Sequence, residues 1–186
     1  MAYDSQSRSI PFQNAYWVEK DRFMAGEYPL AFNSEQSRRR LGSLLSHGIR
    51  RIIDLTEPEE IYRLGSGHPG YEELVNEAAR DMGVKADYVS MPVRDFDAPL
   101  RKIMVRILDI IDEALSSGRP VYVHCWAGLG RTGTVVGAWL VRHGHASDYT
   151  LLETIQQMRM HTDTAFMDSP QSRGQRELIL SWVPYE

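Results

Sequence analysis

The sequence predicts a single α/β domain with a mostly parallel central sheet and helices on both faces. Short β-branched and aromatic runs alternate with segments whose apolar residues recur at helical spacing, and glycines stand where those segments stop. The 186 residues, 42% of them hydrophobic and 25% charged, suit one soluble globular domain. We therefore expect one domain over residues 1–186, with its core at about 15–183.

The N-terminal half is expected to alternate strands and helices. The first helix places Leu41, Leu44 and Leu45 on one stripe and stops at Gly48, and the second stops at Gly83. In order, we predict strands at 16–18 and 22–25, a helix at 34–47, a strand at 49–55, a helix at 71–82 and a strand at 84–91.

The C-terminal half contains the clearest helical pattern, which spans residues 100–115. Its expected buried face consists of Leu100, Ile103, Met104, Ile107, Leu108, Ile111 and Leu115. A strand at 120–124 follows, then a helix at 135–141 that is apolar nearly all round and therefore buried, and helices at about 147–160 and 174–182. Parallel sheets of this kind bind ligands at the carboxyl ends of their strands.

Charge and composition exclude several classes of protein. A net charge of −4 lacks the basic footprint of a general nucleic-acid binder, and no apolar run approaches the ~20 residues of a membrane span. The N-terminus does not resemble a secretory signal, so we expect a cytoplasmic protein. We expect no cofactor and no metal, since His143 and His145 have no evident third ligand. A single cysteine, Cys125, rules out an intramolecular disulfide.

The chemistry concentrates between residues 124 and 133, which read His-Cys-Trp-Ala-Gly-Leu-Gly-Arg-Thr-Gly. Cys125 ends a strand and Arg131 opens a helix, so backbone N–H groups and the positive end of the helix dipole converge on an anion. The same field favours a nucleophilic thiolate on Cys125, and Arg131 would grip two oxygens of a phosphate. The predicted phosphate-binding residues are Trp126, Ala127, Gly128, Leu129, Gly130 and Arg131.

Two neighbours of this loop are expected to support it. Thr132 would offer its hydroxyl to the thiolate when the sulfur departs, and His124 would orient the loop by hydrogen bonding to nearby carbonyls. A lone cysteine after a strand is more often a small buried hydrophobe. The combination of residue types around Cys125 argues against that interpretation.

This stretch resembles the phosphate-binding loop of the cysteine-based protein tyrosine phosphatase superfamily, His-Cys-x-x-Gly-x-x-Arg-Ser/Thr. Here His124, Cys125, Gly128, Arg131 and Thr132 fill the pattern, and the segments 17–29 and 48–55 look like the N-terminal half of the compact dual-specificity-type domain. The resemblance implies a dual-specificity-phosphatase-like fold and an enzyme that works without metal, through a phosphocysteine intermediate. The substrate would be a phosphorylated protein or a small phosphomonoester, and the oligomeric state stays open.

Such a mechanism also needs a general acid on a loop near the phosphate. Asp95 and Asp97 follow a predicted strand, and the family's Pro-x-x-Asp pattern favours Asp95. Asp97 is the alternative, although it could instead cap the following helix with Pro99 in the first turn. Near the C-terminus, Gln175 resembles, better than Gln171, a family glutamine that helps to position water.

Two other functions remain in competition with a protein phosphatase. One is an inositol phosphate or phosphoinositide phosphatase, which tends to carry basic residues inside the loop, where this chain has Trp126, Ala127 and Leu129. The other is a phosphate-binding module with weak or lost catalysis, against which Cys125 and Arg131 argue.

Overall fold

A computed structural model describes residues 10–60, 70–147 and 149–184 of the chain. A five-stranded sheet in the order β1-β2-β5-β3-β4 forms its centre, with β1 antiparallel to β2 and the remaining pairs parallel. The strands are β1 (Ala15–Glu19), β2 (Phe23–Gly26), β3 (Arg51–Asp54), β4 (Asp87–Ser90) and β5 (Val121–His124). The helices are α1 (Ser34–Ser46), α2 (Tyr71–Asp81), α3 (Arg101–Ser116), α4 (Gly130–Arg142), α5 (Leu151–Met158) and α6 (Arg173–Leu180).

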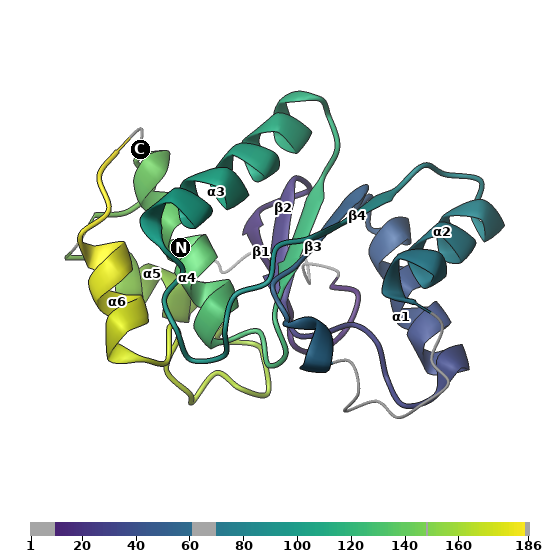
Figure 1. Ribbon diagram of the computed structural model, residues 1–186, viewed down its shortest axis with the longest axis horizontal. Helices are drawn as coiled ribbons and strands as arrows, with labels where there is room; N and C mark the ends of the chain where they lie inside the picture. The colour runs from purple at the N-terminus through teal and green to yellow at the C-terminus, as the bar shows by residue number, and fades with distance from the viewer. Residues whose placement is uncertain (1–9, 61–69, 148, 185–186) are drawn as a thin grey trace, which may run out of the picture.

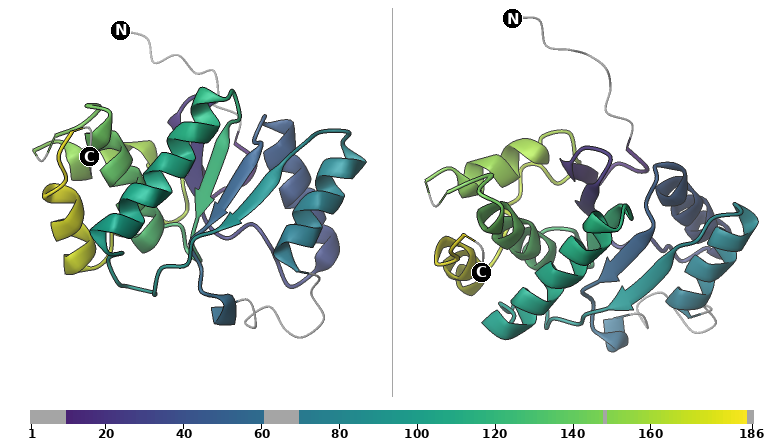
Figure 2. Two further views of the ribbon diagram at one scale, coloured as in Figure 1. Left: turned by 45° about the horizontal axis from the view of Figure 1, so that its top comes forward. Right: turned by 90° about the horizontal axis from the view of Figure 1, so that it is seen from above.

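Helices cover both faces of the sheet, as predicted (Figures 1 and 2). Alternate residues of each strand point to opposite faces. Ile53 and Val123 belong to the larger core cluster, under α3, α4, α5 and α6, whereas Ile52 and Tyr122 belong to the smaller cluster, under α1 and α2. The two clusters explain why the central strands β3 and β5 are apolar on both sides.

The helix stops predicted at Gly48 and Gly83 are confirmed, and Gly118 ends a third helix in the same way. Gly48, Gly83 and Gly118 follow α1, α2 and α3 with φ angles of 89°, 65° and 67°, in the left-handed region that glycine adopts without strain. At the other end of α1, Asn33 caps the helix by accepting hydrogen bonds from the backbone N–H groups of Glu35 and Gln36.

Several predicted elements differ from the structure at their ends. Leu100, assigned to the buried face of its helix, precedes α3 and is 67% exposed. The strand expected from residue 84 begins at Asp87, because Val84 N–H donates to the Ala79 carbonyl and so closes α2. The helix expected at 135–141 extends over Gly130–Arg142, and all of its residues are buried. The glycine-rich loop thus leads directly into α4.

The C-terminal helices are shorter than expected, since α5 covers 8 residues and α6 also covers 8. In the parts of the chain that the structure describes, none of the helices combines the length and hydrophobicity needed to cross a bilayer.

Candidate active site

Cys125 directly follows β5 at the carboxyl edge of the parallel strands and is 3% exposed. Residues 125–130, named the phosphate loop here, connect it to the first turn of α4. That turn is fully buried, so its free N–H groups and the helix dipole act in a medium that screens them poorly. The sulfur and the predicted phosphate-binding residues therefore lie together at one helix N-terminus.

The phosphate loop packs tightly against the end of β2. Gly128 has a φ of 72°, and a Cβ atom there would lie 2.5 Å from the carbonyl carbon of Gly26. Both the backbone angle and this contact require glycine. On the other side of Gly128, Tyr28 N–H donates to the Trp126 carbonyl at 3.0 Å, and the two aromatic rings stack with centroids 5.2 Å apart. The loop shape is thus fixed by the segment after β2.

His124 is completely buried behind the phosphate loop. Its Nε2 lies 3.0 Å from the Tyr71 hydroxyl, and its Nδ1 lies 3.3 Å from the Cys125 carbonyl oxygen. Burial lowers the pKa of His124 below 6.5, although the nearby Asp54 carboxylate acts in the opposite direction. A neutral imidazole that bridges Tyr71 and the loop backbone is the arrangement predicted for an orienting residue.

Arg131 reaches from α4 to the loops that follow β3 and β4. Its Nη1 and Nη2 donate to Glu60 Oε2 at 2.5 Å and Oε1 at 2.9 Å, and Nη2 lies 3.0 Å from Asp95 Oδ1. Nη1 also donates to the Val93 carbonyl at 3.1 Å. Burial opposes the charge, but the hydrogen bonds that Arg131 donates to Glu60 and the negative groups around the guanidinium raise the pKa of Arg131 further above its usual value. Arg131 is therefore a permanent, oriented cation.

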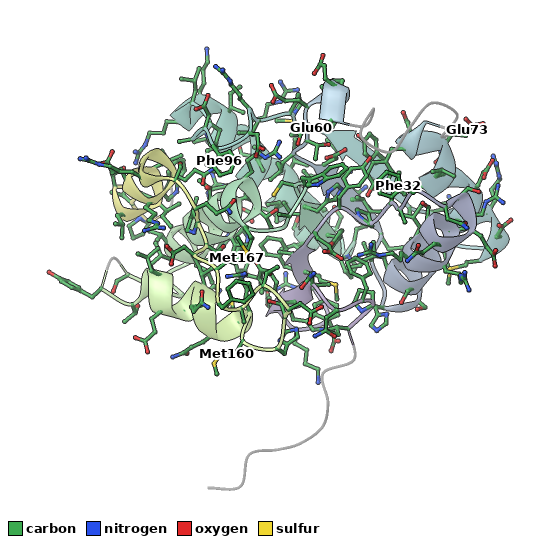
Figure 3. The ribbon with its side chains drawn as sticks, turned by 90° about the horizontal axis from the view of Figure 1, so that it is seen from below. Phe32, Glu60, Glu73, Phe96, Met160 and Met167 are labelled. Carbon is green, nitrogen blue, oxygen red and sulfur yellow. The ribbon has the colours of Figure 1, made fainter. Side chains whose placement is uncertain are left out.

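Glu60 was not among the predicted site residues. It is 5% exposed and lies in the segment after β3, on the face of the molecule seen in Figure 3. A signal for it existed in the sequence, because Glu57-Pro58-Glu59-Glu60 follows a buried strand at the ligand-binding edge of the sheet. Periodicity alone could not select one glutamate of the three.

Residues 91–100, named the acid loop here, carry both candidate acids. The structure brings Asp95 to Arg131, whereas the Asp97 side chain is 60% exposed and lies 3.8 Å from Arg94. The alternative role of Asp97 as a helix cap is wrong, because the N-cap residue of α3 is Leu100 and no side chain caps that helix.

The acid loop turns sharply beside Asp95. Asp97 N–H donates to the Arg94 carbonyl at 3.1 Å, and Phe96 has a φ of 60°, at a turn position that glycine or asparagine normally occupies. The Phe96 side chain is 59% exposed on the same face as Glu60 (Figure 3). Asp95 N–H also donates to Glu57 Oε2 at 3.3 Å, which links the two loops.

The remaining predicted residues lie around the start of α4. Thr132 is buried, and its hydroxyl donates to the Gly26 carbonyl at 3.5 Å. Gln175 is completely buried and forms a capping box with Ser172 at the start of α6. The Oε1 atoms of both Gln175 and Gln171 would lie about 3 Å from a Cβ atom on Gly130, so both glutamines reach the end of the phosphate loop.

Possible metal ligands do not gather at this site. Within the described ranges, no group of three or more His, Cys, Asp or Glu side chains could hold a metal ion. His143 instead lies 2.9 Å from Asp112 at the far end of α4. The site as described offers a buried thiol, a helix N-terminus, a fixed guanidinium and a carboxylate, which together suit the capture and nucleophilic attack of a tetrahedral oxyanion.

Comparisons with known proteins agree with this arrangement. Residues 30–145 match the family model described as polymorphic toxin system, DSP-PTPase phosphatase. The chain is 29% identical over 150 residues to protein tyrosine phosphatase domain-containing protein 1 of Mus musculus, with 72% of this chain and 20% of that protein covered. It is 26% identical over 161 residues to phosphatidylglycerophosphate phosphatase PTPMT2 of Arabidopsis thaliana, with 86% and 62% covered. The chain thus spans less than two thirds of either relative.

Solved structures show the same fold at low sequence identity. Tk-PTP in its active form has a TM-score of 0.65 at 23% identity, with 89% of this chain and 93% of that chain covered. A kinase associated phosphatase whose catalytic cysteine is replaced by serine has a TM-score of 0.68 at 16% identity, with 89% and 90% covered.

Proposed function

The chain belongs to the DSP-PTPase phosphatase family, and we propose that it hydrolyses phosphomonoesters through a covalent phosphocysteine on Cys125. The observation that carries this proposal is the meeting of Cys125, the N-terminus of α4, Arg131 and Asp95 at one edge of the sheet. Together these groups form the constellation needed for phosphoryl transfer.

In the first step the Cys125 thiolate attacks phosphorus in line with the leaving oxygen. An S–P bond forms while the P–O ester bond breaks, and Asp95 gives its proton to the departing oxygen. Charge on the three equatorial oxygens is stabilised by the phosphate-loop N–H groups and by Arg131, which Glu60 holds in place. His124 keeps the loop backbone oriented from behind.

In the second step water attacks phosphorus and the S–P bond breaks. Asp95, now ionised, accepts a proton from this water, and the sulfur departs as a thiolate. Thr132, whose hydroxyl donates to the Gly26 carbonyl at 3.5 Å in the structure, would turn this hydroxyl to the departing thiolate. Inorganic phosphate and the free enzyme result.

We propose that the substrate is a phosphorylated protein, with phosphotyrosine accepted and phosphoserine or phosphothreonine as further candidates. The wall of the site near Cys125 supports an organic, uncharged leaving group, because Trp126 is stacked on Tyr28 and Ala127 and Leu129 add no charge. A lipid or inositol phosphate is the second candidate, favoured by the similarity to phosphatidylglycerophosphate phosphatase PTPMT2. It ranks lower because the phosphate loop contains no lysine.

The cellular setting is also a proposal. We place the catalytic domain at about residues 15–183 and the protein in the cytoplasm, where a single cysteine stays reduced.

Hydrolysis of p-nitrophenyl phosphate by the purified protein tests the covalent mechanism. We expect turnover that survives EDTA, is inhibited by vanadate and is lost in Cys125→Ser, since serine at this position is not ionised. Activity that persists in Cys125→Ser, or strong loss in EDTA, would contradict the mechanism. A panel of phosphotyrosine, phosphoserine and phosphothreonine peptides with phosphatidylglycerophosphate and inositol phosphates, ranked by kcat/KM, then identifies the substrate class.

Comparison of Asp95→Ala with Asp97→Ala identifies the acid. General acid catalysis contributes on the order of 100-fold or more, so Asp95→Ala should lose about that much kcat for phenyl phosphate, whose leaving group needs a proton. Asp97→Ala serves as the matched control on the same loop, and we expect it to retain most activity. The reverse pattern would reassign the acid to Asp97.

A further inference from the structure

Gln175 connects three parts of the proposed active site that are distant in sequence. Its Oε1 accepts from Ser172 N–H at 3.0 Å, and its Nε2 donates to the Asp97 carbonyl oxygen at 3.2 Å. One partner is an N–H donor and the other a carbonyl acceptor, so the orientation of the amide is fixed by its surroundings. Its Oε1 would also lie 3.0 Å from a Cβ atom on Gly130, which places the amide against the start of α4.

Both polar atoms of the Gln175 side chain are therefore engaged in hydrogen bonds. It is completely buried, and its two polar atoms already hold the cap of α6 and the acid loop. One lone pair of Oε1 and one N–H of Nε2 remain for another partner, so these contacts are compatible with the predicted role in positioning water. The hydrogen bonds that the side chain forms in the structure are those of a strut between α6 and the acid loop.

The acid loop needs such support because of its own backbone. Phe96 adopts a φ of 60° between Asp95 and Asp97, a backbone conformation that is strained for a residue other than glycine. On the side of β3, the loop is held by the hydrogen bond from Asp95 N–H to Glu57. On the side of α6, the Asp97 carbonyl is held by Gln175. In the view of Figure 3, Phe96 lies between α6 and Glu60.

We propose that Gln175 is a positioning residue for the general acid, which it keeps over the phosphate loop by holding the Asp97 carbonyl. This inference rests on the proposed function, in which Asp95 protonates the leaving oxygen. Without the strut, the strained turn relaxes and Asp95 leaves its place beside Arg131. Attack by Cys125 is unaffected, so only reactions that depend on the acid become slower.

Two substrates with different leaving groups distinguish a role of Gln175 in positioning the acid from a purely structural role. Phenyl phosphate needs a proton on its leaving oxygen, whereas 2,4-dinitrophenyl phosphate releases a stable anion. Methionine matches the length of glutamine but has no N–H donor. In Gln175→Met we expect kcat/KM to fall about 10-fold for phenyl phosphate and no more than about twofold for 2,4-dinitrophenyl phosphate.

Two control variants test whether the effect is specific to the strut. Gln171→Met makes the same change in the other glutamine beside Gly130, and Ser172→Ala removes the other half of the capping box. Neither touches the Asp97 carbonyl, so any loss should be equal for the two esters. An equal loss for both esters in Gln175→Met, or a selective loss in either control, overturns the proposal.

Gln175→Glu provides a second test with a pH signature, which keeps the proposal testable if Gln175→Met fails to fold. The introduced carboxyl retains an oxygen for Ser172 N–H, but it donates to the Asp97 carbonyl only when it is protonated. The ratio of variant to wild-type kcat/KM for phenyl phosphate should therefore rise as pH falls. A ratio that does not change with pH contradicts the strut.

Combination with Asp95→Ala separates failure of this inference from failure of the proposed function. Residues that act through one group are not additive, so Gln175→Met should have no selective effect in the Asp95→Ala background. If Asp95→Ala alone does not slow phenyl phosphate selectively, the acid assignment is wrong. If it does and Gln175→Met does not, only the strut is wrong.

Discussion

The pairing of Arg131 with Glu60 shows how a single carboxylate can define a site that lies on three segments. Both guanidinium nitrogens that Glu60 holds are buried, and so is the carboxylate. A buried ion pair contributes little net stability, but removal of one partner leaves an uncompensated charge that costs about 3–5 kcal/mol. The pair is therefore best understood as holding the Arg131 guanidinium in one orientation, as the proposed phosphate site requires.

Glu60→Gln tests this function of the carboxylate. The glutamine amide has the same shape as the carboxylate, but it has only one oxygen that can accept a hydrogen bond from the guanidinium. Arg131 should therefore lose its fixed orientation. We expect kcat/KM for p-nitrophenyl phosphate to fall on the order of 10- to 100-fold, together with a lower free energy of unfolding. Glu59→Gln, on the exposed neighbour, is the matched control. Equal kcat/KM in both variants would show that Glu60 does not orient Arg131.

At the scale of elements, the sequence pattern identified every α-helix and β-strand that the structure describes. The predicted ends of these elements were less accurate, because tertiary contacts decide where a helix or strand begins and stops. The strand predicted from residue 84 begins later, because Val84 N–H forms the hydrogen bond that closes α2. Leu100 lies outside α3, which begins one residue later than predicted. α4 extends beyond the apolar segment 135–141, because its first residues, 130–134, are glycine, arginine and threonine and carry no hydrophobic pattern although they are buried.

The candidate site, too, could be predicted from the sequence only where its residues are close together along the chain. The phosphate loop is contiguous, so its residue types and spacing predicted Cys125 and Arg131 as candidates. In contrast, Glu60 is 71 residues from its partner Arg131 in the sequence, and Asp97 is 78 residues from its partner Gln175. No local pattern encodes such pairings.

At the scale of the whole molecule, the buried His124 makes stability depend on pH. Burial lowers its pKa, so below about pH 6.5 the unfolded chain binds a proton that the native imidazole does not. The free energy of unfolding should consequently fall as pH decreases through this value, by at most about 1.4 kcal/mol per pH unit from this group. Above pH 6.5 both states are neutral and the contribution is constant.

Urea unfolding of wild type and His124→Gln between pH 5 and about 8 measures this contribution. The variant should lose part of the pH dependence, whereas His145→Gln, at an exposed histidine beyond α4, should retain it. An identical slope in wild type and His124→Gln would mean that His124 takes up its proton in the native state as well.

The sequence by itself determined the α/β alternation, the family resemblance, the candidate nucleophile Cys125 and the candidate phosphate-binding Arg131, because each depends on residues that are close together in the sequence. The tertiary structure decided which carboxylates meet Arg131 and what holds the acid loop. The physical reason is that parallel strands bring their carboxyl ends to one edge, where loops from β2, β3, β4 and β5 converge. Which side chains of those loops touch depends on packing across the whole sheet.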